Sequence, residues 1–113
     1  MIMNMSSCVF CEKLADQIPE VREILHVHQK AFDGLLPNVF LGEITRYVLS
    51  GGLARRRVVE FLEKNFYCLG DEVENLIAVS FVENIETVQE LNFATSGVDA
   101  TGLTKEWHKQ KGQ

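Results

Sequence analysis

Two cysteines near the N-terminus, Cys8 and Cys11, form a CxxC motif. This spacing occurs in redox-active dithiols and in one half of many zinc sites. A thioredoxin-like dithiol follows a strand, whereas only seven residues precede this motif. The remaining zinc ligands would have to come, at no characteristic spacing, from Cys68, His26, His28 or His108. We therefore expect free thiols and no metal ion or other cofactor, and Cys8 and Cys11 stay the candidates for a metal or redox role.

His26 and His28 form an HxH pair whose chemistry depends on the secondary structure around it. On a strand both rings would point to one side, whereas on a helix they point about 200° apart and cannot chelate one ion together. His28 falls on the apolar stripe of a predicted helix, so we expect a neutral histidine at the edge of the core with one hydrogen bond. A ligand or proton-transfer role for His28 is the alternative.

Charged side chains fall among apolar residues of the predicted helices: Glu43 and Arg46 flank Ile44, and Glu83 lies in a later apolar stretch. Charges in such positions are buried only when they are paired. They form either an interhelical ion pair at the core edge or a groove in which Glu43, Arg46, Tyr47 and Glu83 meet the basic residues of a partner. Further along, Trp107 covers the core or anchors an interface, since tryptophan is enriched at binding hot spots.

The densest basic cluster is the run Arg55, Arg56 and Arg57. Three consecutive helical residues spread over about 200°, so these side chains cannot form one flat phosphate-binding face. We expect a solvated first turn whose cations, unfavourable at a helix start, pair with neighbouring acids. A DNA-binding helix-turn-helix over residues 37–69 is disfavoured because the chain is acidic and has no basic stripe.

Recognised catalytic motifs do not occur in the sequence. Ser50 and Ser80 have no base at a recognised spacing, no glycine-rich phosphate loop is present, and Glu72 and Glu74 have the positions of helix-capping residues. We therefore expect a protein without enzymatic activity.

Length and composition are those of one globular domain. The chain has 113 residues, of which 46% are hydrophobic, and 16 acidic against 11 basic side chains give a net charge of −5. This charge disfavours nucleic acid as a partner and favours a basic protein. No apolar run approaches the ~20 residues of a membrane span, and the N-terminus does not resemble a secretion signal. We expect one cytoplasmic domain over residues 1–113, with flexible ends at 1–7 and 109–113.

The elements that position these residues are predicted to be helices. Apolar residues recur three and four apart between proline and glycine residues. The pattern predicts helices over 8–18, 19–32, 37–50, 53–69, 71–85 and 87–93, and one or two helical turns in 103–113. Asp71 with Glu74, and Thr87 with Glu90, have the form of capping boxes. A strand over 76–82 is the competing interpretation, but the acidic helical start upstream argues against it.

The predicted fold is all-α: a single domain of five to six helices, arranged as an irregular bundle or a short armadillo- or HEAT-like array. Helix starts recur about every 16 to 18 residues, which is the rhythm of stacked helical hairpins. An irregular bundle has the same rhythm. The helix over 71–85 has little polar face, so we expect it at the centre of the packing.

The segments LPNVFLGEITRY, VVEFLEKNF, EVENLIAVSFVENI and LTKEWHK resemble small bacterial proteins that carry a domain of unknown function. The resemblance covers roughly residues 18–108 and leaves out the N-terminal segment with the CxxC motif. It implies an all-helical, armadillo-like fold and, for some members, a role as immunity proteins that neutralise bacterial toxins. It implies no catalytic residues.

The resulting functional hypothesis is a non-enzymatic protein that binds a basic protein partner, with toxin neutralisation as the form that the resemblance implies. The first acidic contacts to consider are Glu72, Glu74, Glu83 and Glu86. One alternative is a small enzyme, or a ligand- or metal-binding protein, with Glu43, His28 and Glu83 in a pocket between helices. Another is a homodimer with Tyr47 or Trp107 in the interface.

Overall fold

The computed structural model describes residues 4–112, which form helices and connecting loops and contain no strand. The outermost residues of the two expected flexible ends, 1–3 and 113, lie outside the described residues. Seven α-helices and one π-helical segment follow one another along the described chain. They are α1 (Ser7–Gln17), α2 (Pro19–Phe32), α3 (Pro37–Leu49), α4 (Arg55–Asn65), α5 (Asp71–Ile77), η1 (Ala78–Val82), α6 (Val88–Thr95) and α7 (Thr101–Lys111).

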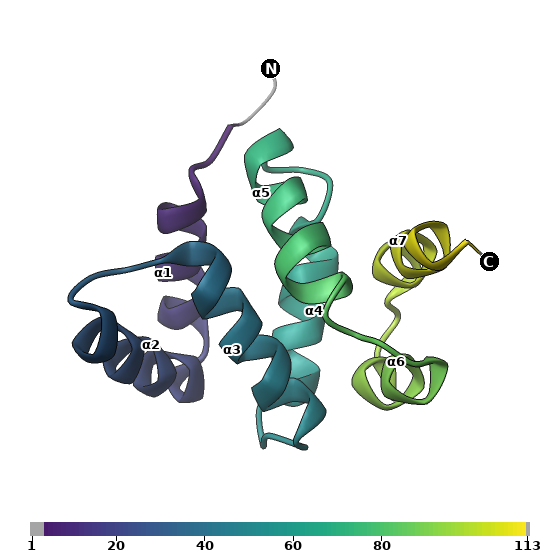
Figure 1. Ribbon diagram of the computed structural model, residues 1–113, viewed down its shortest axis with the longest axis horizontal. Coiled ribbons are helices and arrows are strands. Elements are labelled where there is room, and N and C mark those ends of the chain that lie inside the picture. Colours follow the sequence, from purple (N-terminus) through teal and green to yellow (C-terminus); the bar gives the residue numbers. More distant parts are fainter. Residues whose placement is uncertain (1–3, 113) are drawn as a thin grey trace.

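The helices pack side by side, with α2 next to α3 and with α5 and η1 in the middle of the molecule (Figure 1). α5 and η1 together contact α1, α3 and α7, and α6 and α7 also contact α4. Four phenylalanines, Phe10, Phe40, Phe66 and Phe81, are among the largest buried side chains and come from α1, α3, the turn after α4, and η1. The apolar segment 71–85 therefore lies at the packing centre, as its sequence predicted.

The all-α prediction is confirmed, but seven helices exceed the five to six that were expected. The difference lies in the C-terminal segment, where the sequence predicted one or two turns and the structure has a helix of 11 residues. Trp107 fixes this helix, because its side chain is 2% exposed and its indole N–H donates a 2.6 Å hydrogen bond to the carbonyl oxygen of Ile85. No helix in the described part of the chain combines the length and apolar character of a membrane span.

The two predicted capping boxes have different outcomes. Thr87 and Glu90 form the complete box, with Glu90 N–H donating to the Thr87 hydroxyl at 3.1 Å and Thr87 N–H donating to the Glu90 carboxylate at 3.3 Å. The Asp71–Glu74 box is wrong, because Gly70 occupies the N-cap position with φ 97°. Asp71 then lies inside the first turn, and the box is out of register by one residue.

A π-helical turn follows α5 where a strand was the competing interpretation. Its wider hydrogen bonding, with Glu83 N–H donating to the Ala78 carbonyl at 3.0 Å, leaves other carbonyl groups for side chains. The carbonyl oxygen of Ser80 accepts from the Thr45 hydroxyl at 3.0 Å and from the Asn84 amide at 2.7 Å. Thr45 thus joins the wide turn to α3, and the helical backbone of residues 78–82 shows that the competing strand interpretation is wrong.

A candidate binding cleft between α2 and α3

An open cleft of about 390 Å³ lies between α2 and α3. Its apolar part comes from α2, where Val27 is 67% exposed and Ile24 is half-buried. Its polar part comes from both helices, with carboxylates on each. The lining residues are Glu23, Ile24, Val27, His28 and Ala31 of α2, and Glu43 and Arg46 of α3. The cleft therefore offers an apolar surface bordered by charges.

The wall of the cleft is held by a hydrogen-bonded pair, His28 and Glu43. The His28 side chain is buried, and its Nδ1 lies 3.0 Å from Oε1 of Glu43. On the other side of the ring, Leu36 N–H donates to Nε2 at 3.0 Å. An acceptor at Nε2 requires a lone pair there, so the proton of the neutral ring lies on Nδ1 and is donated to Glu43.

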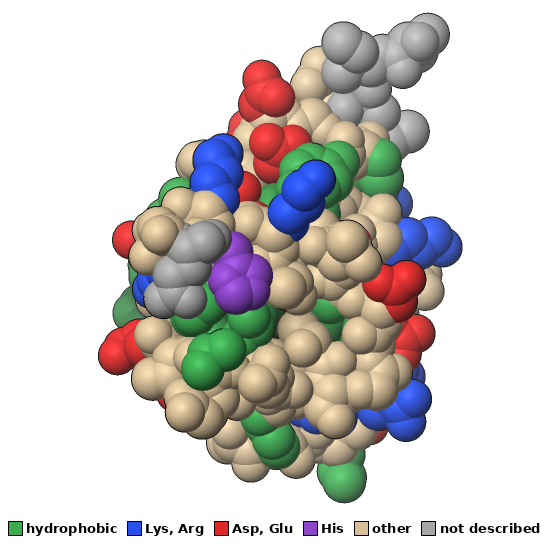
Figure 2. Space-filling model, turned by 90° about the vertical axis from the view of Figure 1, so that its right-hand side faces the viewer, with side chains coloured by type: hydrophobic (Ala, Val, Ile, Leu, Met, Phe, Trp, Pro, Cys, Tyr) green, Lys and Arg blue, Asp and Glu red, His purple; other side chains and the backbone are tan. Residues whose placement is uncertain are grey.

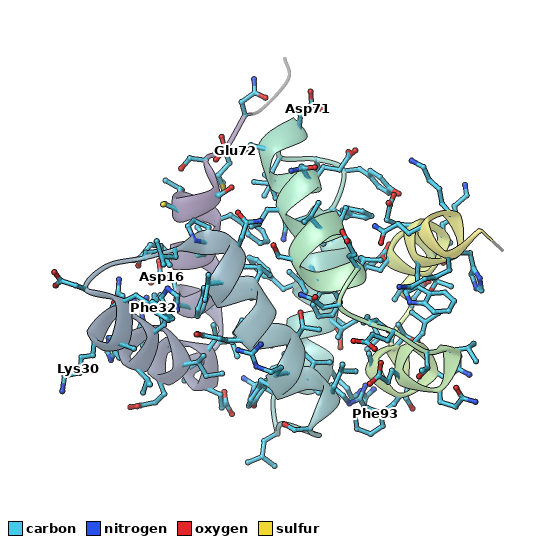
Figure 3. All side chains as sticks on the ribbon, viewed as in Figure 1. Asp16, Lys30, Phe32, Asp71, Glu72 and Phe93 are labelled. Carbon is cyan, nitrogen blue, oxygen red and sulfur yellow. The ribbon has the colours of Figure 1, made fainter. Side chains whose placement is uncertain are left out.

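This geometry assigns His28 a structural role. The prediction of a core-edge histidine is confirmed, although the ring makes two hydrogen bonds and not one. Because both nitrogens are engaged, the ring links α2 to α3 and to the loop between them, and offers no free nitrogen to a ligand. The rings of Phe32 and Phe40 cover it at centroid distances of 4.8 and 5.5 Å. Phe32 itself is 45% exposed and lies at the end of α2 (Figure 3).

Of the predicted site residues, the structure brings Glu43 and Arg46 to the cleft and places the others elsewhere. The Tyr47 hydroxyl accepts from Ala54 N–H at 2.8 Å, so this side chain holds the loop between α3 and α4. Trp107 is a core residue, and the structure fits its alternative role as a cover of the core. Glu83 and Glu86 are exposed beyond the end of η1 and do not line the cleft.

Glu72 stabilises a helix start. One of its carboxylate oxygens accepts from Ser7 N–H at 2.5 Å, at the first residue of α1. This hydrogen bond to the backbone holds the pKa of Glu72 below its usual value. Figure 3 shows Glu72 at the top of α5, beside the first turn of α1. Glu74 follows two residues later on α5 and lines a separate surface hollow with Glu106 and Lys109. Glu72 and Glu74 are thus remote from the α2–α3 cleft.

The arginine run serves the fold in a way that the sequence did not indicate. Arg55 donates to three carbonyl oxygens at the C-terminal end of α6, at 2.9 to 3.0 Å. Arg56 donates to the Gly97 carbonyl at 3.2 Å. Only Arg57 forms the expected pair with an acid, at 2.8 Å from Glu20. The expectation that all three pair with acids is wrong for Arg55 and Arg56, because helix-end carbonyl groups attract cations as carboxylates do.

The sequence did not indicate the role of a fourth charged residue of α4, Glu63. Glu63 accepts from Gly102 N–H at 3.0 Å and from Leu103 N–H at 2.9 Å, and so caps the start of α7. The sequence signal for this contact is indirect. Ala100, at the N-cap position of α7, has no side chain able to cap the helix, so the acceptor must come from another part of the chain.

The cysteines remain thiols in the structure. Cys8 and Cys68 are exposed, whereas Cys11 is buried. Burial raises the pKa of the Cys11 thiol to about 12, and the nearby Cys8 and Glu12 act in the same direction. Within residues 4–112, no three side chains among His, Cys, Asp and Glu gather where they could hold a metal ion.

The remaining cleft residues, Glu23, Ile24, Val27 and Ala31, were not predicted as a site. Val27 and Ala31 are four residues apart on α2 and lie outside the stripe that faces the core, which is the signal that could have found them. The opposite side of the molecule, over α6 and α7, shows hydrophobic side chains in small separate groups among charges of both signs (Figure 2).

Comparisons of the chain with protein-family models, with curated proteins and with solved structures found no match. The family resemblance seen in the sequence therefore stays a prediction, and the functional argument depends on the geometry of the cleft.

Proposed function

We propose that this protein is a non-enzymatic binding module that receives a basic, amphipathic helix of a partner protein in the cleft between α2 and α3. One observation carries the proposal: an exposed apolar strip on α2 is bordered by carboxylates from both helices. Ile24, Val27 and Ala31 form the strip, and Glu23 and Glu43 border it.

The apolar strip supports a helical partner. An amphipathic helix lays residues spaced three and four apart into such a groove, and each buried valine or leucine contributes roughly 1.5–3 kcal/mol. Val27, at 67% exposure, is more accessible to a partner than Ile24, which is half-buried.

The charges support a basic partner. The chain carries a net charge of −5, which steers a cation toward it and makes association faster at low ionic strength. In the cleft, one carboxylate oxygen of Glu43 is hydrogen-bonded to His28. The Glu43 side chain is 23% exposed. Arg46, which also lines the cleft, adds one positive charge and so fixes the direction in which a charged helix lies.

Toxin neutralisation is the specific form of this proposal that the family resemblance suggests. The protein would cover a basic catalytic or nucleic-acid-binding surface of the toxin. An armadillo-like stacking of helix pairs belongs to the same proposal, since such arrays bind partners along a continuous helical surface.

The alternative function, a small enzyme or ligand-binding protein, has one observation in its favour. The structure places His28 and Glu43 in contact at a cleft, as that alternative required. The hydrogen bond from Leu36 N–H to His28 argues against proton transfer, because it occupies the second ring nitrogen. Glu83, the third residue of that alternative, does not line the cleft.

A displayed library of 18-residue peptides tests the proposal. Apolar residues are fixed at helical spacing, the other positions are randomised, and enriched peptides are measured with the full chain by calorimetry. We expect enriched peptides to be basic, to bind more weakly as salt is raised, and to lose at least about tenfold in affinity with Val27→Asp.

The matched control is Val88→Asp on α6, where the valine is 43% exposed. This variant should bind the enriched peptides as the unchanged protein does. The proposal is wrong if no peptide is enriched, if Val27→Asp has no effect, or if both variants lose binding alike. A dimer in light scattering whose dissociation follows Val27→Asp would instead assign the cleft to a second copy of the chain.

A further inference from the structure

A second groove lies between α1 and α4 and shares no lining residue with the α2–α3 cleft. One wall is a face of α1 that includes Phe10 and Lys13, and the other is a face of α4 that includes Phe61 and Lys64. Its volume of about 320 Å³ lies at the lower end of the range for pockets that hold small molecules.

The floor of this groove is apolar. The rings of Phe10 and Phe61 meet there at a centroid distance of 5.6 Å. Met5 and Phe61 are half-buried, so part of their apolar surface stays open to solvent. Met5 N–H also donates to the Leu69 carbonyl at 2.9 Å, which joins the segment before α1 to the segment after α4. The floor therefore offers apolar surface that the core does not cover.

The walls of the groove carry two free ammonium groups. Lys13 on α1 and Lys64 on α4 are both exposed, and neither forms an ion pair within residues 4–112. The carboxylate that lines the groove, Asp16, is paired with Arg22 of α2. In a chain with a net charge of −5, this groove is thus a place where unpaired positive charge borders apolar surface.

We propose that the groove between α1 and α4 binds a medium-chain fatty acid, with its carboxylate between Lys13 and Lys64 and its hydrocarbon chain on Met5 and Phe61. Charge complementarity and the apolar floor together select this ligand. Inorganic phosphate would pair with the lysines and leave the floor uncovered, whereas a neutral alcohol would cover the floor and leave the lysines unpaired. The site is separate from the proposed function, because the two surfaces share no residue.

Calorimetry of the full chain with decanoate, kept below its micelle concentration, tests the site. We expect one decanoate to bind per chain. Octanoate, which has two fewer methylene groups, should bind roughly tenfold more weakly because less chain is buried. 1-Decanol, which has the same chain and no charge, should bind at least about tenfold more weakly than decanoate, and raised salt should weaken decanoate alone.

A pair of double variants separates the site from the net charge. Lys13→Gln with Lys64→Gln should weaken decanoate binding at least about tenfold and leave 1-decanol unchanged. Lys30→Gln with Lys105→Gln removes the same charge at two exposed lysines outside the groove and should bind decanoate as the unchanged protein does. The methyl resonance of Met5, assigned with Met5→Leu, should shift when decanoate binds.

Four results would overturn the inference. Decanoate shows no binding, 1-decanol binds as tightly as decanoate, the two double variants lose affinity alike, or the Met5 methyl resonance stays in place. Loss of decanoate binding in Val27→Asp would place the ligand in the α2–α3 cleft and also refute the site. None of these results changes the peptide experiment, so the two proposals fail separately.

Discussion

Replacement of Glu63 by alanine should loosen the C-terminal helix. The two carboxylate oxygens accept from consecutive N–H groups, Gly102 at 3.0 Å and Leu103 at 2.9 Å. These are donors of the first turn of α7, and they have no acceptor within their own helix. Glu63→Ala removes both acceptors and leaves two partly buried N–H groups without them.

The expected loss follows from these two bonds. A hydrogen bond to a charged group contributes about 1.5–3 kcal/mol, and loss of a helix cap costs about 0.5–2 kcal/mol. Water reaches part of this site, so we expect about 2–3 kcal/mol in the free energy of unfolding. For a chain of 113 residues this corresponds to a fall in melting temperature of about 10 °C. Glu63→Gln, which keeps only one acceptor oxygen, should lose about half as much.

Urea unfolding measures the loss, and the single tryptophan reports where it occurs. Trp107 lies in α7 and is buried, so its fluorescence follows the docking of this helix. Amide exchange at Gly102 and Leu103 should accelerate in the same variant. The control is Glu60→Ala, an exposed residue one turn earlier on α4, which should change stability by less than about 0.5 kcal/mol. Equal effects of the two variants would refute the capping role of Glu63.

Two further predictions concern the N-terminal helix. The pKa of Glu72 is lowered by its hydrogen bond from Ser7 N–H, so its contribution to stability is present above the ordinary glutamate pKa of about 4.3 and is lost as the pH falls through the lower, folded value. Glu72→Gln should therefore be less stable than the unchanged protein at neutral pH, and the two unfolding curves should converge in acid; a constant difference would contradict this. Iodoacetamide at pH 8 should label Cys8 and Cys68 in the folded protein and Cys11 only after unfolding, because Cys11 is buried and its pKa is about 12; mass spectrometry showing three labels on the folded chain would refute it.

Local signals predicted the helices well because proline and glycine set most of their ends. Pro19 and Pro37 stand at the first position of α2 and α3, and Asp33 with a left-handed backbone ends α2. Thr87 and Glu90 form their box within four residues of each other. Such signals involve groups that the chain itself keeps close, so they can be recognised without the tertiary fold.

Contacts between distant parts of the chain could not be predicted in this way. Glu63 and Gly102 are 39 residues apart, and Arg55 meets carbonyl groups 38 to 41 residues away. Nothing in the local pattern distinguishes these side chains from solvated charges. The cleft is an intermediate case: Glu43 and Arg46 were found because they interrupt an apolar face, whereas Val27 was missed although it lies outside the core-facing stripe of α2, because the sequence does not show that α3 packs beside it.

These long-range contacts also change the interpretation of the net charge of −5. Three carboxylates, those of Glu63, Glu72 and Glu90, accept from helix-start N–H groups, and two guanidinium groups, those of Arg55 and Arg56, donate to carbonyl groups near a helix end. Capping therefore explains an excess of one negative charge, and the carboxylate of Glu43, which accepts from His28, is a second negative charge that the fold uses. Acidic groups that the fold does not use raise self-repulsion and speed the approach of a cation. This surplus supports the proposed capture of a basic partner, which salt should slow more than it changes the stability of the fold.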